Sequence, residues 1–157
     1  MTNTFFATDG KAGVDIATPS SVAGFNLGEK VHCNDGTIFH YAKAISAISQ
    51  NYWVGIDEAH NASLLTKGIA DDGWNIGVAP TTFAANDYGW FTMVGTHNGR
   101  VAASCAADVP LYTTAVAGVL DDASTGQTKI DGVVAVTAVT AAAATECILT
   151  YPRASTF

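Results

Sequence analysis

Apolar and polar residues alternate in short segments along most of the chain. From residue 31 onward the apolar positions recur at every second residue, and Gly, Pro, Asn or Asp interrupts the pattern before a helical period develops. Alternation with a period of two is typical of strands that bury one face. Roughly seven to ten strands at this spacing are typical of a sandwich or small barrel. The pattern therefore predicts an all-β fold, a small antiparallel sandwich or barrel with at most short helices.

Two glycine-containing turns give the clearest hairpin signals. Asn34-Asp35-Gly36 separates two alternating arms, so residues 31–44 are predicted to form a hairpin around a three-residue connection. Asn98-Gly99 has the composition of a type I′ turn, in which both central residues have positive φ. It predicts a second, tight hairpin within the segment 96–101.

The remaining strands are shorter and are separated by loops. They are predicted within residues 50–57, 71–80, 88–97, 110–122 and 130–140, with a last strand from Cys147 to Tyr151. Pro152 is expected to end that strand because it cannot donate to the ladder. Residues 57–68 are predicted to be a loop with at most one helical turn, and the alanines at 141–144 are compatible with helix or strand.

The N-terminal region differs from the rest of the chain. Residues 1–30 show no sustained alternation and are punctuated by Gly, Pro and Ser, which predicts an extended arm. Residues 31–157 are predicted to form a single β domain. An arm must dock on something to be ordered, and Phe5, Phe6 and Phe25 are its predicted anchors. The sequence leaves open whether these rings contact a partner or fold back onto their own domain.

The composition of the chain argues against nucleic acid and membrane as partners. The chain has 157 residues and a formal charge of −7, and its seven basic residues form no run or stripe, which argues against nucleic-acid binding. The N-terminus lacks the basic start and apolar stretch of a signal peptide, and no apolar stretch is long enough to span a bilayer. We therefore expect synthesis in a cytoplasm and no partnership with nucleic acid or membrane.

Catalytic signatures are missing from the sequence. It contains no nucleophile elbow, Walker loop, zinc-protease motif or dinucleotide-binding motif, so we expect neither enzymatic activity nor a cofactor. The three cysteines are far apart and are predicted to be reduced, buried thiols.

Histidines give two weak candidates for a metal site. His32 and His40 lie on opposite arms of the first predicted hairpin, and Asp35 at its turn could supply a third ligand. His60 beside Asp57 is the second candidate. We favour the alternatives, a solvated strand face for the first set and a surface loop for the second, and we predict no bound metal.

The segment 86–101, NDYGWFTMVGTHNGRV, contains the densest aromatic cluster. Its rings could form a platform that stacks on a sugar, or they could pack in the core or in a subunit interface. In an alternating strand Tyr88 and Trp90 point one way and Phe91 points the other. Aromatic rings on both faces favour a strand that is covered on both sides, preceded by a turn at Asn86-Asp87.

Several phrases of the sequence resemble a known family. VGID, GVAP, DYGWFTMVG, PLYTTAVAGVLDD, KIDGVVAVTAV and ILTYP occur in the order found in head decoration, or cement, proteins of tailed bacteriophages. The resemblance covers roughly residues 50 to 152, and GFNLGEKVHCNDGTIFHYAKA adds a looser similarity to the family's first hairpin. These are strand-and-turn phrases and not catalytic residues.

The resemblance implies a structural virion protein. Such proteins are made in the host bacterial cytoplasm, bind the outer capsid surface, commonly as homotrimers, and tie neighbouring copies of the major capsid protein together. Phe5, Phe6, Phe25, Tyr88 and Trp90 are then the predicted contacts with the capsid or with other subunits. The alternative is a glycan-binding or receptor-binding β module of a phage tail fibre or adhesin, in which the aromatic cluster would hold the ligand.

Overall fold

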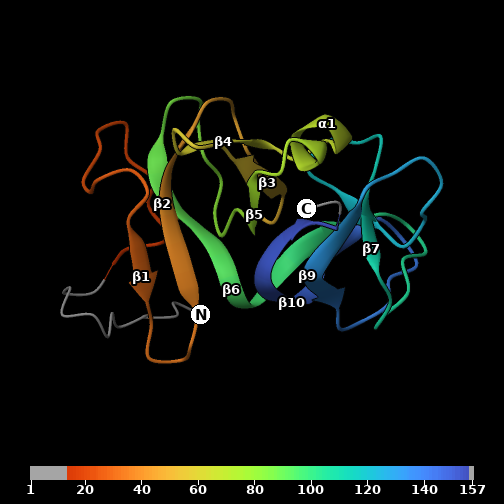
Figure 1. Ribbon diagram of the computed structural model, residues 1–157. Helices are drawn as coiled ribbons and strands as arrows, with labels where there is room; N and C mark the ends of the chain where they lie inside the picture. Colours follow the sequence, from red (N-terminus) through yellow and green to blue (C-terminus); the bar gives the residue numbers. More distant parts are fainter. Residues whose placement is uncertain (1–13, 156–157) are drawn as a thin grey trace.

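The computed structural model describes residues 14–155 and confirms the all-β prediction. The elements in chain order are β1 (Lys30–His32), β2 (Ile38–Ala44), β3 (Trp53–Ile56), β4 (Asn61–Leu64), α1 (Lys67–Asp71), β5 (Asn75–Val78), β6 (Tyr88–Val101), β7 (Leu111–Thr113), β8 (Leu120–Asp121), β9 (Lys129–Ala135) and β10 (Ala143–Ala154). Figure 1 shows β6 crossing the molecule between strands of the first half and strands of the second half.

Five strands close into a barrel. Their order is β2-β4-β3-β5-β6, and β6 returns to pair with β2. Small side chains such as Ala42, Ala44 and Ala62 fill much of the interior, and they leave room for Phe83 and Phe91 to stack with ring centroids 4.5 Å apart. A narrow barrel needs this mixture of small and large side chains, because its interior is filled completely by side chains.

The second half of β6 takes part in another closed set of pairings. β6 pairs with β10, the order continues through β9, β7 and β8, and β8 returns to β6 at the pair Val101–Leu120. The core of this ring also contains Trp53 and Ile76, which come from β3 and β5 of the barrel. The two rings therefore share one strand and pack against one another through a common apolar core.

The predicted strand around Trp90 is confirmed, and it is covered on both faces. Asn86 has a φ of 71° in the turn that precedes the strand. Phe91 is fully buried inside the barrel, whereas Trp90 is 2% exposed in a separate cluster on the outer face. Alternation along β6 separates the two rings in the predicted way.

The predicted hairpin at Asn98-Gly99 is wrong. β6 continues through both residues, with Asn98 opposite Glu146 and Gly99 opposite Thr145 of β10, and neither residue has a positive φ. A Cβ at Gly99 would lie 2.1 Å from Cζ2 of Trp53. Glycine at this position therefore allows a tryptophan ring to pack against the strand, and it does not mark a turn.

Two other boundaries differ from the predictions. Residues 61–64, expected in a loop, form β4, which pairs in parallel with β2 and antiparallel with β3. β10 does not end at Pro152 but runs to Ala154. The proline is tolerated because the ladder with β9 is irregular between Leu149 and Arg153, so its missing N–H is not required there.

The first hairpin follows the prediction, whereas residues 110–122 do not form one strand. Gly36 has a φ of 86° in the turn between β1 and β2, which pair in antiparallel register. Residues 110–122 contain two short strands, β7 and β8, that pair with each other around a loop. The TTAVAG segment between them contains the turn that the alternation did not indicate.

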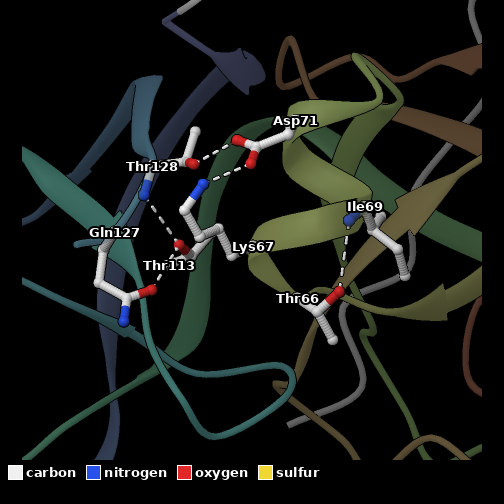
Figure 2. Close-up of polar contacts among 7 residues, drawn as sticks. All are labelled: Thr66, Lys67, Ile69, Asp71, Thr113, Gln127 and Thr128. Carbon is white, nitrogen blue, oxygen red and sulfur yellow. Dashed lines mark hydrogen bonds and ion pairs between the residues drawn. The ribbon is translucent and has the colours of Figure 1, made fainter.

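Polar contacts attach the single described helix to the second ring. The Thr66 hydroxyl caps α1 by accepting from the N–H of Ile69, and Lys67 pairs with Asp71 one turn later. Asp71 also accepts from the Thr128 hydroxyl, and the Thr128 N–H donates to the Thr113 hydroxyl (Figure 2). A five-residue helix is too short to be stable alone, so these contacts account for its position.

Candidate functional site

The described part of the predicted arm lies on the outer face of β2 and β6 (Figure 1). We call residues 14–29 the strap. Ser20 and Tyr88 exchange two backbone hydrogen bonds of 3.0 and 2.8 Å. The Gly24 N–H donates to the Tyr41 hydroxyl at 3.0 Å, and the Gly28 N–H donates to the Tyr41 carbonyl at 2.9 Å. This half of the arm is therefore docked on its own domain.

Three aromatic rings anchor the strap. Phe25 makes edge contacts with Tyr41 and Trp90, with ring centroids 5.3 and 5.1 Å apart, and Tyr41 and Trp90 lie 4.9 Å from each other. Such pairs add about 0.5–1.5 kcal/mol each beyond the area that they bury. Phe25 is thus an anchor on its own domain, while Phe5 and Phe6 lie outside the described residues.

A small cavity lies between the strap and the β6 face. Its volume is about 170 Å³, and it is lined by strap residues, among them Asp15 and Ser20, and by Tyr41, Tyr88 and Trp90 of the domain. Trp90 is 2% exposed, so its ring is not an open platform. A sugar could stack on Trp90 only if the strap moved away.

Three bulky apolar residues of the strap are exposed to solvent. Val22 is 72% exposed, Phe25 39% and Leu27 38%, although the three lie within six residues of each other. A hollow lined by residues 23–26 and Glu29 opens beside them. Single exposed apolar residues are ordinary, but a group of them on a docked segment indicates an interaction surface.

Replacing Phe25 by alanine is expected to loosen the strap. Loss of its half-buried ring should lower the free energy of unfolding by about 1–2 kcal/mol and open Trp90 to solvent. Acrylamide quenching of tryptophan fluorescence in a Trp74→Phe background measures this opening. Val116→Ala, at a position outside the strap that is 61% exposed, is the control and should leave quenching unchanged. Equal quenching in Phe25→Ala and the control would contradict the anchoring role.

The structure brings His40 to His60, whereas the strand register places His32 opposite Ile38. His40 Nε2 lies 3.2 Å from His60 Nδ1, and His60 packs so closely on Gly28 that a Cβ there would lie 2.4 Å from its Nε2. His40 is 2% exposed, and its Nδ1 has no hydrogen-bond partner. Burial, and then the charges of His60 and Lys30, lower the pKa of His40 from 6.5 to about 4. This contact depends on β4, which the sequence pattern did not indicate.

All three cysteines are buried thiols, as predicted. Within residues 14–155, one group of three metal-ligating side chains has its ligand atoms within 4.8 Å of one another, namely Cys105, Asp121 and Asp122. Burial, and then the two carboxylates, raise the pKa of the Cys105 thiol to about 11. The thiol is therefore protonated at neutral pH and serves as a small apolar core residue.

Comparison with known protein families, with curated proteins and with solved structures finds no match to the chain. In the described range, 14–155, no helix has the length and apolar character needed to cross a membrane.

Proposed function

We propose that the protein is a capsid decoration protein that binds the outer surface of a phage head and stabilises contacts between major capsid subunits. The observation that carries this proposal is the strap, which is docked on the domain by Phe25 and exposes Val22 and Leu27 to solvent. A docked apolar segment on a compact β domain is suited to binding another protein, and its anchoring limits the entropy lost on binding.

A role in holding subunits together also fits the distribution of charge and of side chains. The formal charge of −7 keeps the free protein soluble before it binds. Trp90 of β6 and Tyr41 of β2 pack against Phe25 of the strap, which supports a role in holding the strap. We therefore propose a structural role without catalysis, a homotrimer as the binding form, and the virion as its location.

Capsid binding tests the strap directly. Empty capsids assembled from the major capsid protein of the same phage should bind the purified protein saturably and melt at a higher temperature when decorated. Val22→Ser and Leu27→Ser should each weaken binding about tenfold, because each removes about 1.5 kcal/mol of apolar burial. Sedimentation of capsids with labelled protein gives the affinities.

Two exposed apolar residues elsewhere provide matched controls for this experiment. Val116 is 61% exposed and Ile45 is 51% exposed, and both lie outside the strap. Val116→Ser and Ile45→Ser should bind capsids as the unchanged protein does. If they weaken binding as much as Val22→Ser, the strap is not the contact, and if the unchanged protein binds no capsid the proposal fails.

The second candidate function is glycan binding beneath the strap. The cavity beside Tyr88 and Trp90 contains aromatic rings together with Asp15 and Ser20, a combination that sugar sites use. Saturable quenching of Trp90 fluorescence by a glycan, lost in Trp90→Phe and accompanied by no capsid binding, would favour this function. A protein that attaches through the outer side of the strap should bind capsids and leave this cavity unused.

A further inference from the structure

The ladder between β9 and β10 is interrupted by a wide bulge. Between two regular pairs of the ladder, residues 150–152 of β10 lie opposite the single residue Gly132 of β9. Gly132 has a φ of 79°, and a Cβ there would lie 2.6 Å from the Thr150 carbonyl oxygen. Glycine is therefore needed for β10 to bend at this point. Bulges of this kind often re-aim side chains beside binding sites.

Tyr151 at the centre of the bulge has a strained backbone. Its φ is 48°, in the left-handed region that bulky residues avoid, and it precedes Pro152, which restricts its backbone further. The ring is 43% exposed, so burial in the core does not explain the strain. Strain without compensating burial is typical of a side chain that is held in place for binding.

Tyr151 lines a hollow that contains charged groups. Its volume is about 470 Å³, within the range of about 300–1,000 Å³ that is usual for small-molecule sites. The lining residues are Asn75, Asp131, Gly132, Thr150, Tyr151 and Arg153. They offer a flat ring, a guanidinium, a carboxylate, an amide and a hydroxyl, which together can meet the apolar face and the hydroxyl groups of a sugar ring.

Three cations, Lys30, Lys129 and Arg153, lie in or beside this hollow, whose lining contains one carboxylate, Asp131. Asp131 is paired with Lys129 at 2.8 Å, and the hydrogen bonds from Lys129 and then Ser155 lower the pKa of Asp131. The Lys30 ammonium lies 5.3 Å from the centre of the Tyr151 ring, and Arg153 lines the hollow. The charge of Arg153 also acts on Asp131, but the three cations outnumber this one carboxylate and can attract an anionic group. A guanidinium can bind a carboxylate through two hydrogen bonds.

We propose that this hollow binds an acidic saccharide, with the sugar ring against Tyr151 and its carboxylate against Arg153. The amide of Asn75 and the hydroxyl of Thr150 provide hydrogen bonds to the sugar hydroxyls. This site is independent of capsid attachment, because no residue of the strap lines the hollow.

Calorimetry with the full-length protein tests the ligand class. The acidic probes are hyaluronan tetrasaccharide, an alginate oligomer and sialyllactose, and their neutral counterparts are chitotetraose and lactose. At least one acidic probe should bind saturably and about tenfold more tightly than its neutral counterpart, because the ion pair with Arg153 is lost in the neutral sugar. Inorganic phosphate should not displace it at equal concentration. Absence of binding by all three acidic probes, or equal binding of the neutral sugars or of phosphate, would overturn the proposal.

Two variants and one control assign the binding to this hollow. Tyr151→Asn removes the ring but keeps a residue that tolerates positive φ, and Arg153→Gln removes the charge with little change in size. Each substitution should weaken binding of the acidic probe at least about tenfold. The melting temperature of each variant should stay within about 2 °C of that of the unchanged protein. Arg100→Gln is the matched control, because Arg100 lies over the Tyr52 ring and pairs with Ala144, far along β10. Retained binding in Arg153→Gln, which leaves the φ of Tyr151 and the Gly132 contact in place, would refute the site even if Tyr151→Asn failed to fold.

Discussion

Gly99→Ala is expected to be among the most damaging single-methyl changes in this protein. The added Cβ would lie 2.1 Å from Cζ2 and 2.7 Å from Cε2 of Trp53, which is fully buried. The indole cannot slide aside, because its N–H donates to the Arg100 carbonyl at 2.9 Å. Overpacking at such a position costs about 3 kcal/mol of unfolding free energy, so urea denaturation should show a clearly lower midpoint with an unchanged slope.

A second substitution at Trp53 isolates the steric cause. In a Trp53→Phe background the ring is smaller, and Gly99→Ala should cost less than about 1 kcal/mol, which gives a coupling of about 2 kcal/mol. Gly68→Ala is the control, because its nearest neighbour would be 4.0 Å from the new Cβ and alanine favours a helix. If Gly99→Ala costs the same in both backgrounds, contact with Trp53 is not the reason for the glycine.

Stability is expected to fall on mild acidification because of His40. Its native pKa of about 4 lies below its ordinary value of 6.5, so in that interval the unfolded chain binds a proton that the native protein does not. The stabilising contribution is complete above pH 6.5 and is lost progressively as the pH falls toward about 4. After allowance for partial solvation we expect a loss of about 2 kcal/mol, measurable by urea denaturation at pH 7 and pH 4.5.

Replacing His40 by phenylalanine should flatten this pH dependence. Phenylalanine fills a similar volume without a titrating group, and it removes the unpartnered Nδ1. Part of the slope should remain, because burial also lowers the pKa of His97. A slope that persists in full in His40→Phe would show that another group is responsible.

The local pattern of the sequence was sufficient where neighbours in sequence decide the structure. The hairpin at residues 31–44 and the strand at Trp90 depend on turn residues and alternation, and both were predicted. The hairpin prediction at Asn98-Gly99 was wrong because glycine occurs both in tight turns and where another group packs closely on the backbone. Only the position of Trp53, which is distant in sequence, distinguishes the two cases. The prediction that the last strand ends at Pro152 was wrong for a similar reason, since the bulge that accommodates this proline depends on Gly132.

The candidate sites were less predictable than the fold. Phe25 was identified from the sequence as an anchor, but its contacts with Tyr41 and Trp90 depend on the packing of the strap on two strands. The hollow at Tyr151 had no sequence signal, because its lining residues come from β5, β9 and β10, and Tyr151 itself reads as an ordinary strand residue. Pairing between distant strands creates such sites, and alternation along one strand does not reveal it.

The position of β6 between the two rings has a consequence for how the chain reaches its native state. The barrel cannot close until β6 has found β2, which precedes it by about fifty residues, and the second ring cannot close until β6 has found β10, which follows it by a similar distance. Such distant pairings slow folding into the range of milliseconds to seconds, and they link the two halves in one cooperative transition. A chain cut in the loop after Val101 should therefore leave two fragments that regain structure only when they are mixed, which tests whether the halves are a single folding unit.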